Sequence, residues 1–225
     1  MQYNEILLKL KALSDPEAVV GMARFGINPE NTLGVSIPNL RKIARETGKD
    51  HTLALQLWAS GIHEARILAG MVDDPKMVTE EQLENWVNDF DSWDVCDGCC
   101  MNLFEKTGFA YGKAVEWSSR ESEFVKRAGF VMMARLAVSD KKADDGKFEQ
   151  FLPIIIKEAG DDRNFVKKAV NWALRQIGKR SRYLNRKAVE TASKIQELDE
   201  KSARWIAADA IRELTDPKVL ARIKR

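Results

Sequence analysis

The sequence predicts an all-α fold arranged as a solenoid of paired antiparallel helices. Apolar residues recur at helical spacing along nearly the whole chain, and alternating strand patterns are absent. Similar segments also recur about 40 residues apart: FVKRA at 124–128 resembles FVKKA at 165–169, and ALRQI at 173–177 resembles AIREL at 210–214. Two-helix repeats of this length are typical of the HEAT type of α-solenoid, an α-α superhelix in which neighbouring repeats bury each other's inner faces. We therefore expect one domain over residues 1–225, and a plain helical bundle is the alternative.

The individual helices follow from the same periodicity, in chain order. Ile6, Leu7, Leu10 and Leu13 form the apolar face of the first helix, and Ser14-Asp15-Pro16 is a stop and restart signal. The next helix surrounds residues 40–44, after an Ile-Pro pair. The remaining helices are expected at 53–58, 65–71, 83–90, 93–104, 111–117, 123–136, 148–157, 164–179, 182–198 and 202–214.

Composition narrows the class of protein. A hydrophobic content of 44% and a charged content of 31% over 225 residues are typical of a soluble globular protein. The first residues lack a signal-peptide pattern and no apolar run is long enough to cross a membrane, so we expect a cytoplasmic protein. We also expect it to act as a monomer. Cys96, Cys99 and Cys100 supply too few ligands for zinc, so we expect reduced, partly buried thiols and neither metal nor cofactor.

Charge is unevenly distributed along the chain, although its net value is only +2. Residues 73–105 contain ten acids, whereas residues 163–187 contain nine Lys and Arg and no acid. A basic stretch with helical spacing predicts a phosphate-binding surface, lining a concave basic groove if the solenoid is correct. The alternative is a solvated helix face. The nine cations are Arg163, Lys167, Lys168, Arg175, Lys179, Arg180, Arg182, Arg186 and Lys187.

One segment combines an indole with a carboxylate. Trp93 and Asp97 are four residues apart and therefore share one helix face. Asp91 or Asp94 near the start of that helix is most simply interpreted as a cap. Asp97 lies one turn further on, among thiols and apolar residues, where burial would raise its pKa and a nearby cation would lower it. The alternative for Asp97 is a surface acid or an ion pair.

Two further candidates lie in the second half of the chain. Arg127 interrupts an apolar helix, and Trp172 stands at the matching place in the next repeat, within the basic stretch. An indole among cations is well placed to meet a sugar or base, although a tryptophan in a helix is more often core. Four other tryptophans lack such a setting and are expected to be packing residues: Trp58, Trp86, Trp117 and Trp205.

The chain resembles a known family. Residues 92–104 (SWDVCDGCCMNLF), 124–130 (FVKRAGF) and 168–175 (KAVNWALR) resemble the active-site helices of the DNA alkylation repair (AlkD-like) glycosylases. Residues 31–41 and 57–66 look like the family's two N-terminal repeats. The resemblance implies a HEAT-like solenoid that holds double-stranded DNA and excises N3- and N7-alkylated purines without a closed base-flipping pocket.

The resemblance also implies residue roles. It assigns the essential carboxylate to Asp97, the sugar-contacting indoles to Trp93 and Trp172, and a phosphate contact to Arg127. Further phosphate contacts are expected from a set of six other cations. That set is Arg66, Lys168, Arg175, Lys179, Arg180 and Arg182.

Two other functions remain open on the sequence. One is a non-catalytic HEAT-repeat protein that binds damaged or branched DNA. The other is a scaffold that binds an acidic protein segment through residues 163–187. Spacing and charge alone favour nucleic-acid binding over catalysis, and only the family resemblance favours the enzyme.

Overall fold

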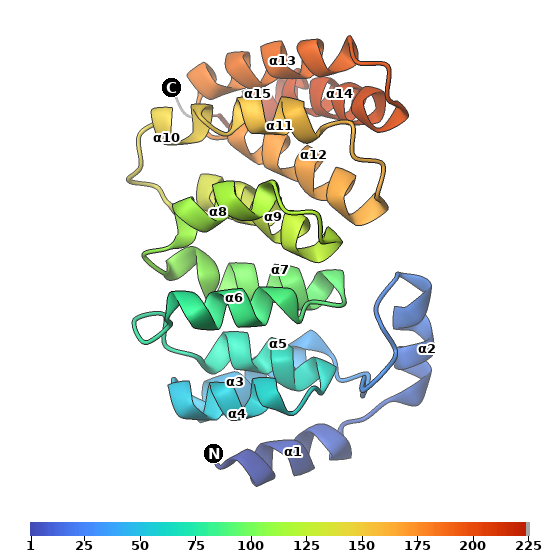
Figure 1. The fold of residues 1–225 in the computed structure, drawn as a ribbon, viewed down its shortest axis with the longest axis vertical. Helices are drawn as coiled ribbons and strands as arrows, with labels where there is room; N and C mark the ends of the chain where they lie inside the picture. Colours follow the sequence, from blue (N-terminus) through green and yellow to red (C-terminus); the bar gives the residue numbers. More distant parts are fainter. Residues whose placement is uncertain (224–225) are drawn as a thin grey trace. The chain divides into compact units, whose positions relative to one another are not determined.

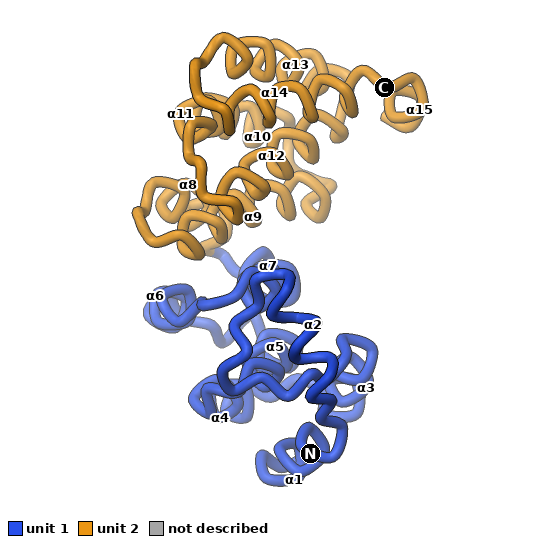
Figure 2. Tube along the Cα trace, turned by 90° about the vertical axis from the view of Figure 1, so that its right-hand side faces the viewer, with its two compact units in different colours: residues 1–108 blue, residues 109–225 orange. Residues whose placement is uncertain are grey.

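The computed structural model describes residues 1–223. Within those residues all regular structure is helical and no strand occurs, as Figure 1 shows. The chain divides into two compact units, residues 1–108 and residues 109–225, which Figure 2 draws in different colours. The expected single domain over the whole chain stays a prediction. Among the described residues no helix is long and apolar enough to cross a membrane.

Unit 1 pairs its helices in two layers. In Figures 1 and 2, α4 and α6 form one layer while α5 and α7 form the next, and α3 packs against α5. Trp58 of α4 stacks on Trp86 of α6 with ring centroids 4.0 Å apart, and Phe90 and Phe104 complete this aromatic core. The elements of unit 1 are α1 (Tyr3–Ala12), α2 (Pro16–Arg24), α3 (Ile37–Thr47), α4 (His51–Ala59), α5 (His63–Val72), α6 (Glu80–Asn88), α7 (Trp93–Asn102) and the 3₁₀ turn η1 (Phe104–Lys106).

Unit 2 is built on α9, which packs against both α8 and α12, while α14 packs against α12 and α13. The α8–α9 contact is very close: a Cβ added at Gly129 would lie 2.4 Å from the Ser118 nitrogen. Glycine is therefore required there by the approach of two backbones. The helices of unit 2 are α8 (Ala110–Ser118), α9 (Glu123–Ser139), α10 (Gly146–Glu149), α11 (Leu152–Glu158), α12 (Asn164–Gly178), α13 (Arg182–Gln196), α14 (Lys201–Leu214) and α15 (Pro217–Leu220).

The helix predictions are confirmed except in detail. Asp15 caps the restarted helix α2 by accepting the Ala18 N–H at 3.0 Å. The helix expected at 148–157 is two helices, α10 and α11, because Pro153 lies in the first turn of α11. Proline is tolerated in a first turn, where its missing N–H costs nothing, and breaks a helix interior. The short helix α15 was not predicted.

Candidate nucleic-acid interface

The structure places the first two candidate residues on α7, in unit 1. Trp93 begins this helix and Asp97 lies one turn further on, and both side chains are partly exposed. The Trp93 indole N–H donates to the backbone oxygen of Phe25 at 3.1 Å, beyond the end of α2. The orientation of Trp93 is therefore fixed by a segment 68 residues away in the sequence.

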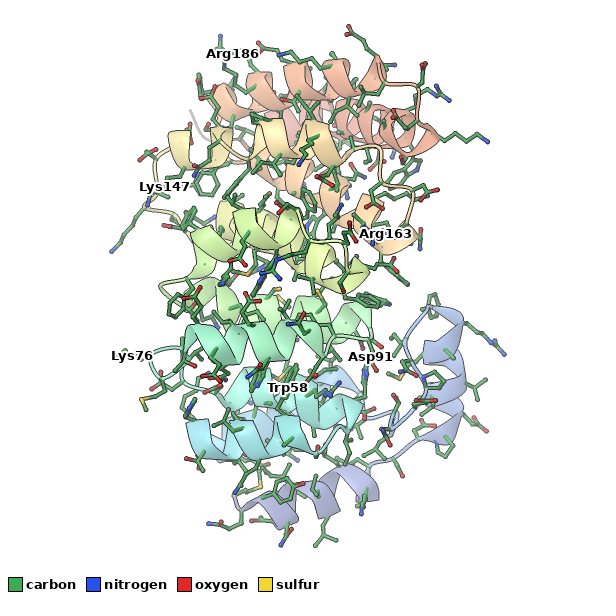
Figure 3. All side chains as sticks on the ribbon, viewed as in Figure 1. Trp58, Lys76, Asp91, Lys147, Arg163 and Arg186 are labelled. Carbon is green, nitrogen blue, oxygen red and sulfur yellow. The ribbon has the colours of Figure 1, made fainter. Side chains whose placement is uncertain are left out.

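The segment between α2 and α3 is fastened to the start of α7. The Asn28 backbone N–H donates to Ser92 Oγ at 2.9 Å, and the Asn28 side-chain amide donates to Asp91 Oδ2 at 2.7 Å. Figure 3 labels Asp91 in the turn before α7, on the side where the α2 segment lies. Asp91 therefore binds the α2–α3 segment, and Ser92 is the N-cap residue of α7, so of the two acids expected as a cap, Asp91 or Asp94, Asp91 does not serve as one.

A buried carboxylate holds the same segment from α5. Glu64 is 1% exposed, and its Oε1 accepts the N–H groups of Leu33, Gly34 and Val35 at 3.1, 2.6 and 3.1 Å. Its Oε2 accepts the Leu33 N–H at 2.9 Å. Gly34 has a φ of +81° in this turn, and a Cβ there would lie 2.2 Å from the Asp15 oxygen. Such an array of backbone N–H groups satisfies a buried negative charge.

A histidine–aspartate pair joins α5 to α7. His63 Nε2 lies 2.9 Å from Asp94 Oδ2, and the other oxygen of Asp94 accepts the Val95 N–H at 3.0 Å. Asp94 therefore does satisfy a first-turn N–H, although its second oxygen serves His63. Burial alone would lower the pKa of His63, but the hydrogen bond and charge of Asp94 outweigh it and raise the pKa.

Arg127 and Trp172 lie in unit 2, on helices that pack against each other. Arg127 on α9 is only 7% exposed, and one of its N–H groups donates to the Phe165 backbone oxygen in the first turn of α12 at 2.7 Å. Trp172 is partly exposed on α12. With the Gln176 amide oriented to satisfy its neighbours, its oxygen accepts from Trp172 Nε1 at 3.0 Å and from Lys179 Nζ at 3.2 Å.

Carboxylates from elsewhere in unit 2 neutralise part of the basic stretch. Arg175 and Lys179 each bind Glu213 on α14 at 2.5 Å. Arg180 lies over the Phe148 ring at 4.1 Å and donates to the oxygens of Ala137 and Ala143. These contacts give the three cations structural partners within the unit.

The other residues that were expected to contact phosphate differ in whether they already bind a partner within their unit. Lys168 and Arg182 are exposed and form no ion pair within the described residues. In unit 1, Arg66 lies over the Trp58 ring at 5.3 Å and donates to the Asp89 backbone oxygen at 3.0 Å. The concave basic groove thus stays a prediction, and Lys168 and Arg182 are its most accessible cations.

The packing predictions hold for three tryptophans. Trp58, Trp86 and Trp117 are 5%, 3% and 0% exposed, whereas Trp205 is 43% exposed, so the prediction for Trp205 is wrong. Ala208, which follows Trp205 by three residues, is also exposed, so this side of the helix faces outward.

The three thiols are fully buried in α7 and form no disulfide among the described residues. Burial raises the pKa of the Cys99 and Cys100 thiols well above their usual range, so they are poor nucleophiles. They serve the packing of α7 on α5, where a Cβ at Gly70 would lie 3.3 Å from Cys99 Sγ.

The structure therefore places Trp93 and Asp97 on one helix of unit 1. In unit 2, Arg127 binds the first turn of α12, the helix that carries Trp172. Sequence reasoning missed Asn28, Glu64 and His63, which hold the α2–α3 segment and α7 in place. His63 and Glu64 are polar residues directly before the apolar helix at 65–71, whereas Asn28 carried no such signal, and the partners of all three lie about 30 to 64 residues away.

Known proteins resemble this chain in fold and sequence. A solved structure described as "A new family of proteins related to the HEAT-like repeat DNA glycosylases with affinity for branched DNA structures" superposes with a TM-score of 0.79 at 20% identity, covering 100% of this chain and 98% of the other. The fold is thus that of the HEAT-like repeat DNA glycosylases, as predicted.

Sequence comparison gives a further relative and the family. The uncharacterized protein Lin0241 of Listeria innocua is 26% identical over 132 residues, which are 57% of this chain and 59% of that protein. The match thus spans less than two thirds of this relative's length. Residues 6–214 match the family model described as DNA alkylation repair enzyme, and the chain therefore belongs to that family.

Proposed function

We propose that this protein is a monofunctional DNA glycosylase that hydrolyses the N-glycosidic bond of N3- and N7-alkylated purines in duplex DNA. The observation that carries the proposal is the pair of partly exposed side chains, Trp93 and Asp97, on a helix whose start is fixed by other segments. Membership of the DNA alkylation repair enzyme family supports the same chemistry.

The proposed reaction needs a carboxylate and no acid. An alkylated N3 or N7 makes the purine cationic, so the base leaves without being protonated. The sugar then resembles an oxocarbenium ion, as in glycoside hydrolysis. Asp97 would stabilise that positive charge and hold the attacking water, an effect typically worth about 3–4 kcal/mol.

The indoles would act on the sugar. The face of Trp93 would lie against the deoxyribose beside Asp97, where a cation–π contact contributes roughly 0.5–2 kcal/mol. A sugar contact by Trp172 in unit 2 is proposed from the family resemblance. The Phe25 carbonyl and the Gln176 amide hold the two indole N–H groups, so each ring is oriented before DNA binds. Preorganised groups of this kind stabilise a transition state without reorganising during the reaction.

Phosphate binding would use the exposed cations first. Lys168 and Arg182 have no carboxylate to release within the described residues, whereas Arg175 and Lys179 would exchange Glu213 for a phosphate. Arg127 is buried and bonded to the Phe165 carbonyl, so a phosphate contact by this residue would need its side chain to turn outward. Binding should then weaken steeply as salt rises.

The second candidate is a non-catalytic protein that binds damaged or branched DNA. It is favoured by the described affinity for branched DNA of the structural relative. It requires DNA binding but not Asp97.

The deciding experiment is single-turnover release of 7-methylguanine and 3-methyladenine from methylated duplex DNA. Asp97→Asn should slow release at least tenfold, which corresponds to about 1.4 kcal/mol of lost transition-state stabilisation. Asp199→Asn, the same change at an exposed acid before α14, is the matched control and should leave the rate unchanged.

Three results would count against the proposal as stated. Release that Asp97→Asn leaves unchanged would keep the enzyme and assign its carboxylate elsewhere. An equal loss in Asp199→Asn would show that the effect is one of general charge. No release from the wild type, with salt-dependent binding of branched DNA intact, would establish the binding protein.

A further inference from the structure

Trp205 on α14 has an exposed indole that is not buried in the core of unit 2. Its side chain is 43% exposed on α14, and Lys201, Ala208 and Arg212 lie at helical spacing on the same exposed side. A tryptophan that contributed only to the core would be turned inward, as Trp58, Trp86 and Trp117 are. The exposed ring therefore has a surface available for another molecule.

The charge around the Trp205 ring is positive because the two carboxylates of α14, Asp209 and Glu213, bind other residues of unit 2. Asp209 binds Asn171 at 2.7 Å and also pairs with Arg212, while Glu213 binds Arg175 and Lys179 at 2.5 Å. These contacts turn both carboxylates toward partners within unit 2.

Four cations near Trp205 remain without a carboxylate in the described part of the chain. Lys167 Nζ lies 5.7 Å from the Trp205 ring centroid, and Lys168 follows it as an exposed residue on α12. On α14, Lys201 and Arg204 are exposed one turn and one residue before Trp205. The nearest acids in sequence, Asp199 and Glu200, belong to the turn before α14.

We propose that this surface, defined by Lys167, Lys168, Lys201, Arg204 and Trp205, binds unpaired single-stranded nucleic acid. One base would stack on the Trp205 indole, and the cations would meet the phosphates on either side of it. Stacking on an aromatic side chain combined with a basic backbone track is how sequence-tolerant single-strand binding is achieved.

The exposed indole of Trp205 indicates that the bound strand is unpaired. A base in a duplex has both faces covered by its neighbours, so an exposed indole gains a base face only where the strand is unpaired. A contact with duplex phosphates would need the lysines and arginine but not the indole. Base stacking on Trp205 does not depend on the proposed chemistry at Asp97, although Lys168 belongs to both proposed sets of phosphate contacts.

The test is fluorescence anisotropy with a 5′-labelled thymidine homopolymer, which has no internal pairing, compared with a labelled duplex. Trp205→Ala should weaken single-strand binding about tenfold, which is about 1.4 kcal/mol. Trp205→Phe should retain most of the affinity, whereas Trp205→Leu should behave like Trp205→Ala, because leucine keeps apolar area without an aromatic face. Duplex binding should change less than twofold in all three variants.

A matched aromatic control is available on α13. Tyr183 is 39% exposed beside Lys187, but its hydroxyl and that lysine both bind Glu149. Tyr183→Ala should therefore leave single-strand affinity unchanged. Replacing Lys201 and Arg204 with alanine should reduce the slope of log affinity against log salt by about 0.7 for each phosphate that the variant no longer neutralises.

Several outcomes would overturn the inference. They are unchanged binding by Trp205→Ala, an equal loss in Tyr183→Ala, an equal loss of duplex binding, or displacement of the strand by polyglutamate of the same charge. Because the indole is partly exposed, Trp205→Ala should fold, and its melting temperature checks this. If Trp205→Ala does not fold, the comparison of Trp205→Phe with Trp205→Leu tests whether an aromatic face is required. Single-strand binding by Asp97→Asn, and base release by Trp205→Phe, separate this site from the proposed enzyme.

Discussion

Replacing Glu64 with glutamine should loosen the segment between α2 and α3. The carboxylate of Glu64 is 1% exposed and is bonded by the N–H groups of Leu33, Gly34 and Val35. Glutamine has nearly the same shape, so it creates no cavity. It removes the charge and brings an amide NH₂ close to the Leu33 N–H, which now lies 2.9 Å from Oε2.

The size of the effect follows from these contacts. A hydrogen bond to a charged group contributes about 1.5–3 kcal/mol, and one between neutral groups about 0.5–1.5 kcal/mol. Three N–H donors would therefore lose about 1 kcal/mol each. Removing a buried charge also relieves its desolvation cost, which offsets part of that loss. The expected net decrease in the stability of the segment is about 2 kcal/mol.

Hydrogen exchange measures this locally, without assuming that the two units unfold together. Exchange of the Leu33, Gly34 and Val35 amides should become about 30-fold faster in Glu64→Gln, the factor that 2 kcal/mol implies. Glu30→Gln is the matched control, since Glu30 is exposed in the same segment. Exchange rates in Glu64→Gln within threefold of those in the control would refute the reasoning.

Three further predictions concern other contacts. Because the pKa of His63 is raised, its charged pair with Asp94 stabilises the fold fully below about pH 6.5, and this stabilisation is lost as pH rises through the folded pKa. The wild type should therefore lose more unfolding free energy between pH 6 and 9 than His63→Gln, as measured by urea titration. Equal pH profiles would contradict this. Gly129→Ala should destabilise the protein by about 2 kcal/mol or more in the same titration, because its Cβ would lie 2.4 Å from the Ser118 nitrogen; a loss under 0.5 kcal/mol would show that α8 and α9 move apart easily. Cys99 should resist a thiol reagent in the native protein and react only on unfolding, because it is fully buried with a raised pKa; rapid native labelling would show that α7 opens.

The helices could be predicted because their signals are local. Apolar spacing, Asp15 before Pro16 and the recurring segments all lie within a few residues of the structure they specify. The predictions failed locally at Pro153, which divides one expected helix although its signal was present in the sequence, and at the short helix α15, which was not expected. The match of fold to the HEAT-like repeat DNA glycosylases confirms the class that periodicity and repeat length indicated.

The candidate site could be predicted in part. Helical spacing puts Trp93 and Asp97 on one face of α7, and the structure has both partly exposed there. No spacing rule could have shown that the Phe25 carbonyl binds the Trp93 indole or that Glu64 binds Leu33–Val35. Such contacts depend on how distant segments meet in three dimensions.

The sequence by itself thus determined the helical elements, their repeat and the residue types of the site, because backbone conformation and helix faces depend on neighbouring residues. Tertiary structure decided which charges and rings are available. Glu213 from α14 neutralises cations of an acid-free stretch, and packing turns Trp117 inward but leaves Trp205 exposed. Charge pairing and burial are properties of groups brought together by folding, so a linear run of charge could not reveal them.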